Sequence, residues 1–265
     1  MPPTAARPAT SSALLWLLAS GVVIILLVAM CILLNARAKN QLAITRNPYS
    51  PNGILVWPIA IAGHWPVKVN FDFRIKQDIV RHALARSGPH AIVDCGAHVG
   101  DGAVPIAAAL AELGRSDIVV YAVEPDPHKC AIIQRLGQLN HVSNLRIICT
   151  GLSDSDGQYV EANIPFGNSG GTTWKQSDAA DKGTQFQRLD SLYANGTISQ
   201  PLGCLHLDVE GMELAALRGA QQAIQTYKPY LSVEDNGHFR DMYLRALPGY
   251  RFVQRLHAND VFVPE

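Results

Sequence analysis

From about residue 71 onward, short apolar runs alternate with amphipathic segments. The runs, rich in Val, Ile and Leu, span 90–97, 117–125, 144–152, 202–209 and 230–235. Segments with apolar residues at helical spacing span 75–86, 102–113, 127–139, 213–227 and 238–247. Pro105 and Pro127 fit this pattern because each falls in the first turn of its predicted helix. The alternation predicts βαβ units and therefore a mostly parallel sheet with crossover helices.

The last part of the chain predicts a different connection. Residues 250–256 and 260–263 are two short apolar runs joined by His-Ala-Asn, which is typical of a hairpin. Together with the five earlier strands they give a seven-stranded sheet with a C-terminal antiparallel hairpin. Residues 155–187 are rich in Gly, Ser and Thr, and we expect them to be irregular. Residues 71–265, roughly 195 in number, suit one domain.

The N-terminal part has another character. Residues 13–34 contain no charged side chain, and as a helix they would span about 33 Å, enough for the core of a bilayer. A cleaved signal peptide is the alternative, but its apolar core is shorter, about 7–15 residues. We predict a short tail at 1–12, a transmembrane helix at 13–34 and a juxtamembrane linker at 35–70.

Charge gives an orientation and excludes one class of partner. Arg37, Lys39 and Arg46 follow the apolar segment, whereas Arg7 and the amino terminus precede it. Because basic residues favour the cytosolic side, the domain is expected in the cytosol, attached to the membrane. The chain has 22 basic and 22 acidic residues, so a nucleic-acid-binding surface is not expected.

The cysteines predict neither a disulfide framework nor a zinc site. The five residues show no C-x-x-C and no paired Cys/His spacing. They are Cys31, Cys95, Cys130, Cys149 and Cys204. The interpretation is that those in the domain are buried free thiols, as in a reducing compartment.

Two acidic residues end neighbouring predicted strands. Asp94 lies in V-D-C-G-A-H-V-G, followed closely by Gly96 and Gly100, and Glu124 lies in V-Y-A-V-E-P. The carboxyl ends of parallel strands are where such sheets bind nucleotide-like ligands. The glycines would allow close approach of the backbone to a ligand. Glu124 would accept hydrogen bonds from ribose hydroxyls.

The identity of residue 94 narrows the choice of ligand. A dinucleotide fingerprint requires G-x-G-x-x-G, and Asp94 occupies the place of its first glycine. A carboxylate there would repel a pyrophosphate but would suit a ligand with a cationic part, such as S-adenosylmethionine. The plainer alternative is an ordinary strand-to-helix turn in which Asp94 caps the helix.

Five motifs together carry a family resemblance. They are V-D-C-G-A-H-V-G at 93–100, V-E-P at 123–125, G-L-S-D at 151–154, R-L-D-S-L at 188–192 and L-H-L-D-V-E-G-M-E-L-A-A-L-R-G-A at 205–220. In this order the chain resembles the class I S-adenosylmethionine-dependent methyltransferases, and within them the FkbM family. The resemblance implies a Rossmann-like sheet. His206 departs from the family pattern, which usually has Lys at that position.

The resemblance also implies roles for individual residues. The amino-acid part of the cofactor would be lined by Asp94, Gly96, Ala97 and Gly100. Glu124 would bind the ribose, and Ser153 with Asp154 would lie near the adenine. Asp208 and Glu210 would lie beside the transferred methyl group. From the residues alone, Asp154 could equally form a turn with Gly157, and Asp190 could cap a short helix.

Methylation of a hydroxyl needs a group that accepts its proton. The expected catalytic residues are Asp208, Glu210 and His238, because the first two follow strand 202–209 and His238 follows strand 230–235. Glu234, Asp235 and His206 are further candidates at these strand ends. The acidic group could hold a divalent cation, but its spacing does not establish a site, so we expect no metal.

The sequence therefore predicts a membrane-anchored, S-adenosylmethionine-dependent methyltransferase. It is expected to methylate a hydroxyl group of a small molecule, a glycan or a lipid-linked acceptor. One alternative is an NAD(P)-dependent oxidoreductase, which Asp94 disfavours. Another is a membrane-tethered binding protein with an inactive cofactor fold, which His206 keeps open.

Overall fold

The computed structural model describes residues 42–46, 54–58, 73–163, 172–176 and 183–265. The predicted membrane helix at 13–34 lies outside the described residues. Among the described helices, none combines the length and the apolar character that crossing a bilayer requires. The chain divides into two units, and the second, Ala43–Trp57 with Val67–Glu265, contains nearly all of the described residues.

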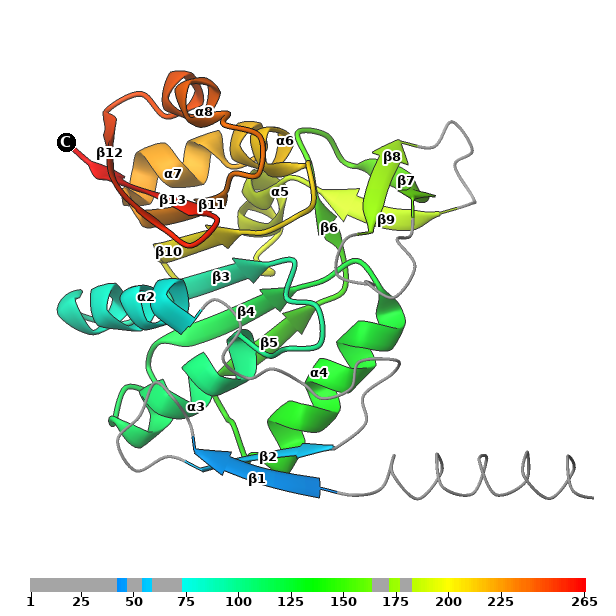
Figure 1. The fold of residues 1–265 in the computed structure, drawn as a ribbon, viewed down its shortest axis with the longest axis vertical. Coiled ribbons are helices and arrows are strands. Elements are labelled where there is room, and N and C mark those ends of the chain that lie inside the picture. Colours follow the sequence, from blue (N-terminus) through cyan, green and yellow to red (C-terminus); the bar gives the residue numbers. More distant parts are fainter. Residues whose placement is uncertain (1–41, 47–53, 59–72, 164–171, 177–182) are drawn as a thin grey trace, which may run out of the picture. The chain divides into compact units, whose positions relative to one another are not determined.

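A seven-stranded sheet forms the centre of the second unit (Figure 1), in the order β12-β13-β11-β10-β3-β4-β5. Its strands are β3 (Ala91–Cys95), β4 (Val119–Val123), β5 (Leu145–Ile148), β10 (Leu202–Leu207), β11 (Tyr230–Glu234), β12 (Tyr250–Leu256) and β13 (Asn259–Pro264). The pairs from β11 through β10, β3 and β4 to β5 are parallel, whereas β13 pairs antiparallel with β11 and β12. The predicted strand number and terminal hairpin are confirmed.

Helices pack against the sheet in two groups. One comprises α2 (Phe73–Ala85), α3 (Ala103–Glu112) and α4 (Pro127–Leu139). The other comprises α5 (Leu189–Ala194), α6 (Glu213–Arg218), α7 (Gln221–Tyr227) and α8 (Arg240–Ala246). Side chains alternate along a strand, so Val93 of β3 packs in the core with α5 to α8. Asp94 then points to the opposite face, toward α2.

The described parts of the region expected to be irregular, residues 155–163, 172–176 and 183–187, contribute to a second sheet. Its order is β6-β9-β7-β8, with β6 (Gly151–Leu152), β7 (Gly157–Asn163), β8 (Thr173–Gln176) and β9 (Thr184–Gln187). The expectation was wrong because a small aromatic cluster holds the strands together. The rings of Tyr159 and Phe186 stack with centroids 4.3 Å apart, and Trp174 lies 5.4 Å from Phe186. The predicted strand 144–152 is accordingly divided between the two sheets.

Two other elements differ from their predicted extent. Residues 35–70 were expected to be a plain connector, but β1 (Leu42–Arg46) and β2 (Ile54–Pro58) pair with each other. The predicted helix 213–227 is interrupted at Gly219, whose carbonyl accepts from the Asp190 amide at 2.9 Å. The Asp190 carboxylate accepts from the amides of Gln222 and Ala223, so it caps α7 and creates the break.

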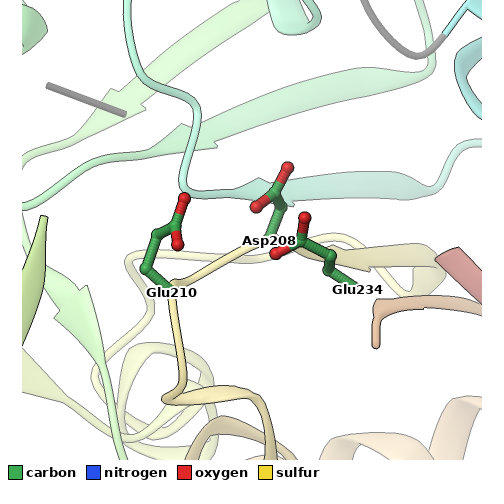
Figure 2. Close-up of side chains that lie close together, drawn as sticks. All are labelled: Asp208, Glu210 and Glu234. Atoms are coloured by element: carbon green, nitrogen blue, oxygen red, sulfur yellow. The ribbon is translucent and has the colours of Figure 1, made fainter. Parts of the chain in front are cut away.

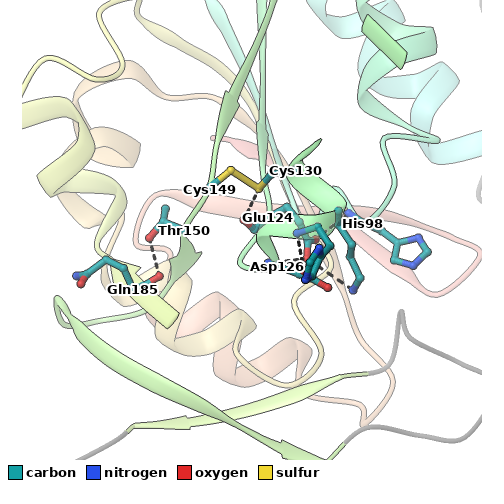
Figure 3. Close-up of a disulfide and its surroundings, with 9 residues drawn as sticks. His98, Glu124, Asp126, Cys130, Cys149, Thr150 and Gln185 are labelled. Carbon is teal, nitrogen blue, oxygen red and sulfur yellow. Dashed lines mark hydrogen bonds and ion pairs between the residues drawn. A yellow bond between two sulfur atoms is a disulfide. The ribbon is translucent and has the colours of Figure 1, made fainter. Parts of the chain in front are cut away.

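A disulfide joins Cys130 of α4 to Cys149, which follows β5 (Figure 3). The expectation of free thiols at these two positions was therefore wrong. Residues 19 apart in sequence come together because the crossover from β4 through α4 returns the chain to the same end of the sheet, with Cα atoms 6.0 Å apart. Cys95 and Cys204 are free and buried, as expected.

Candidate functional site

The turn after β3 is built on the end of β4. The amides of Gly96 and Ala97 both donate to the carbonyl of Val123, at 3.0 and 3.1 Å. Gly96, His98 and Gly100 all have positive φ, so the backbone turns sharply at three points within five residues. Such a turn requires glycine at most of these points. We call Asp94, Gly96, Ala97 and Glu124 the β3–β4 edge.

Glu124 fastens this turn to the next strand. One of its carboxylate oxygens accepts from the His98 amide at 2.9 Å, and the other accepts from the Asp126 amide at 3.2 Å. Lys129 of α4 places its ammonium 3.6 Å from the same carboxylate. Burial raises the pKa of Glu124, and the Lys129 charge opposes that shift. Glu124 thus shapes the turn as well as standing at the expected ribose position (Figure 3).

The glycines of the turn have protein neighbours. A Cβ on Gly96 would overlap the backbone carbonyl of Asp208, and the Asp208 amide donates to Cys95 at 3.1 Å. A Cβ on Gly100 would lie 3.1 to 3.3 Å from Val104 and Ile133. Packing therefore requires glycine at position 96, whereas at position 100 a Cβ would crowd two neighbouring side chains. The expected role in approaching a ligand stays a prediction.

Asp94 is buried on the α2 face, where charged and polar groups surround it. His206 of β10 places Nε2 3.9 Å from Asp94 Oδ1, and its Nδ1 lies 3.2 Å from the Ser232 hydroxyl. Burial raises the pKa of Asp94 to about 6; the ammonium of Lys76 opposes this and Asp101 adds to it. His206 is thus a buried neighbour of the first motif, reached through the strand register that pairs it with Asp94.

Three carboxylates gather where β10 and β11 end (Figure 2). Asp208 and Glu210 follow β10 and Glu234 ends β11, and one oxygen from each lies within 4.8 Å of the others. We call these three residues the β10–β11 edge. Burial, reinforced by the charge of Glu234, raises the pKa of Asp208 to about 9 and that of Glu210 to about 7. At neutral pH the group therefore holds protons that isolated carboxylates would release.

Glu213, in the first turn of α6, holds the loop that carries Glu210. Its Oε1 accepts from the amides of Val209 and Gly211, both at 3.1 Å. Glu210 itself has φ of 52°, which is uncommon for a residue with a side chain. Glu213 thereby fixes an otherwise unfavourable turn. The sequence analysis assigned it no role, although an acid in the first turn of a helix is a recognisable capping signal.

The remaining predicted site residues lie on the second sheet and on the loop after β11. Ser153 is buried against the second sheet, where its hydroxyl lies 2.7 Å from the Tyr159 hydroxyl, and Asp154 is exposed. His238 is exposed on the loop after β11, with φ of 62°. Asp235 accepts from the Gly237 and Phe239 amides and lies 3.5 Å from Arg255. Asp235 is therefore a structural residue of that loop, which removes one candidate base.

The geometry allows two kinds of chemistry at the β10–β11 edge. Carboxylate oxygens at this spacing suit a hard divalent cation, and the same oxygens can attract an organic cation and accept a proton. The burial that raises these pKa values is relieved by either kind of positive charge. The expectation of no metal stays a prediction.

The model of the methyltransferase FkbM domain matches residues 94–252, which is more than half of the chain and includes the five motifs described above except for Val93. No curated protein matches the chain.

Two solved structures with a similar chain path are described as a methyltransferase and a methylase. Methyltransferase FkbM from Methylobacillus flagellatus KT is 20% identical with a TM-score of 0.47, over 69% of this chain and 46% of that one. An rRNA methylase from Streptococcus thermophilus is 10% identical with a TM-score of 0.43, over 74% of this chain and 96% of that one. The present chain thus spans less than half of the FkbM structure.

Proposed function

Starting from the fact that this chain belongs to the FkbM family of methyltransferases, we propose that it transfers a methyl group from S-adenosylmethionine to a hydroxyl group. The acceptor would be a small molecule, a glycan or a lipid-linked compound, and residues 13–34 would anchor the enzyme in a membrane. The observation that carries the proposal is the convergence of Asp94, Glu124 and Asp208 at the carboxyl ends of adjacent strands.

The residues of the site fit the proposed cofactor. S-adenosylmethionine supplies an activated methyl group on a positively charged sulfur. The β10–β11 edge offers three carboxyl groups for such a charge, and burial together with their mutual repulsion disfavours the ionisation of Asp208. At the β3–β4 edge, Glu124 is the expected partner of the ribose hydroxyls, because a carboxylate oxygen can accept more than one hydrogen bond.

Glu210 is better matched than Asp208 as the proton acceptor. A general base works best when its pKa lies near the working pH, and the pKa of Glu210 is raised to about 7. Asp208, with a pKa raised to about 9, is protonated at that pH until a positive charge arrives. We therefore assign Glu210 the proton from the acceptor hydroxyl and Asp208 the positive charge of the donor.

Calorimetric titration of the full chain with S-adenosylmethionine tests the proposal. We expect binding by the wild-type protein and a loss of at least about tenfold in affinity for Glu124→Ala, which removes the acceptor for the ribose hydroxyls. Asp126→Ala is the control, because it removes a carboxylate of the same strand end that caps α4 through His128. No binding by the wild type would end the proposal.

The orientation of the domain is tested separately. The flanking basic residues support a cytosolic domain, whereas disulfides such as Cys130–Cys149 persist mainly in oxidising compartments. Protease added to sealed inside-out vesicles should digest a cytosolic domain. Protection of the domain there, with digestion in right-side-out vesicles, would place it on the opposite side.

A further inference from the structure

Lys76 is a buried lysine that the family motifs do not include. It lies on α2, ahead of the matched residues 94–252, and only 7% of its surface is exposed. Lysine is seldom buried to this extent unless its charge is paired. Its environment is therefore informative about what the ammonium does.

The Lys76 ammonium lies at the turn after β3. Its Nζ is 3.7 Å from Asp101 Oδ2. A Cβ placed on Gly102 would lie 2.8 Å from Lys76 Nζ and 3.2 Å from Asp94 Oδ2. The Lys76 side chain therefore fills the space that a side chain on Gly102 would take, and its ammonium lies near the Asp94 carboxylate.

A positively charged and a negatively charged side chain thus lie close together where the amino-acid part of the cofactor is expected. An α-amino acid carries an ammonium and a carboxylate on one carbon, so a binding site for it needs an anion and a cation close together. Asp94 supplies the first and Lys76 the second. Asp101 keeps the Lys76 charge compensated, and the three donors of an ammonium allow it to serve a second anion.

We propose that Lys76 and Asp94 form a two-sign subsite for the amino-acid tail of the cofactor, in which Lys76 binds the α-carboxylate and Asp94 binds the α-amino group. This inference rests on the proposed function. It adds a specificity residue from α2, and it makes recognition of the carboxylate independent of the family motifs.

The alternative is that Lys76 only ties α2 to the turn through Asp101. The two roles differ in what they do to ligands that lack the carboxylate. A structural tie supports every ligand of the site, so its loss would weaken all of them alike. A carboxylate-binding residue matters only for ligands that carry the carboxylate.

Three ligands separate these roles by calorimetry on the full chain. S-adenosylhomocysteine carries both charges of the tail, its decarboxylated analogue carries only the amino group, and 5′-methylthioadenosine carries neither. We expect Lys76→Met to weaken S-adenosylhomocysteine about 10- to 100-fold and the other two less than about threefold. Asp94→Asn should weaken the two amino-bearing ligands and leave methylthioadenosine nearly unchanged.

Matched variants complete the test. Lys76→Arg keeps the charge and should retain most of the preference for the carboxylate. Lys228→Met removes an exposed lysine just before β11, at the opposite end of the strands, and should change nothing. Equal weakening of all three ligands by Lys76→Met, or no weakening, would overturn the subsite. Failure of the wild type to bind any ligand would instead overturn the proposed function, and the subsite with it.

Discussion

The β3–β4 edge and the β10–β11 edge are adjacent in the sheet, but their carboxylates have different partners. Glu124 receives two backbone amides and the charge of Lys129, and Asp94 has Lys76 nearby. At the β10–β11 edge the three carboxyl groups face one another, and the pKa of Asp208 rises to about 9. Burial raises the pKa at both edges, but at the β10–β11 edge burial and the charge of Glu234 outweigh the opposing charges of Lys76 and Lys129.

The difference indicates which edge is built for stability and which for a ligand. A carboxylate whose partners come from the protein stabilises the fold and pre-forms a turn. Carboxyl groups that face one another destabilise the fold until a cation arrives, which is typical of functional sites. We therefore expect the first edge to govern folding and cofactor binding, and the second to govern the chemistry.

Substitution of Gly96 should have the largest effect on stability, because Gly96 of the first edge packs directly against the backbone of Asp208 in the second. Gly96→Ala should destabilise the protein by about 3 kcal/mol or more, since the new Cβ would overlap the Asp208 carbonyl as well as disfavour the positive φ. Gly114→Ala is the matched control, because its φ of 75° is nearly the same and no atom lies within 4 Å. It should cost only about 1–2 kcal/mol. Equal losses in denaturant unfolding would contradict the packing argument.

The Cys130–Cys149 disulfide is a second feature that we expect to stabilise the fold. Removing it with Cys130→Ala and Cys149→Ala should lower the free energy of unfolding by about 2–4 kcal/mol, because the unfolded chain gains freedom. Reductant should lower the melting temperature of the wild type and leave that of the double variant unchanged. A reductant effect of the same size on both proteins would show that the bond does not contribute.

A substitution at the β10–β11 edge should stabilise the protein rather than destabilise it. Asp208→Asn removes one of three facing carboxyl groups, so it should stabilise the ligand-free protein by about 1–2 kcal/mol at pH 8 while abolishing most activity. The folded-state pKa of Asp208 lies above its unfolded value, so the folded protein binds more protons and wild-type stability falls as pH rises from about 4 to about 9.

The pH dependence of unfolding checks this sign. The Asn variant should show a flatter decline of stability over the same window, and its advantage over the wild type should shrink as the pH falls below about 4, where Asp208 becomes protonated in both states. Asp235→Asn is the control, because Asp235 has amide and Arg255 partners and its loss should destabilise. A steeper decline for Asp208→Asn would contradict the assignment.

The sheet, its hairpin and the two motif turns could be predicted from the amino-acid sequence, because strand and helix periodicity and turn residues are local signals. The sequence also placed acids at the strand ends, and parallel strands necessarily bring those ends to one edge. Local pattern could not reveal the second sheet, because the Tyr159–Phe186 stack joins segments that are far apart along the chain.

The role of each acidic residue, in contrast, depends on its partners in the folded protein. Asp235 and Asp190 resemble Asp208 in sequence, yet they hold backbone amides, whereas Asp208 faces Glu210 and Glu234. The Cys130–Cys149 disulfide and the buried Lys76 likewise depend on crossovers that bring distant residues together. A carboxyl group's partners set its pKa and its role, and those partners are chosen by packing across the sheet rather than by neighbours in the chain.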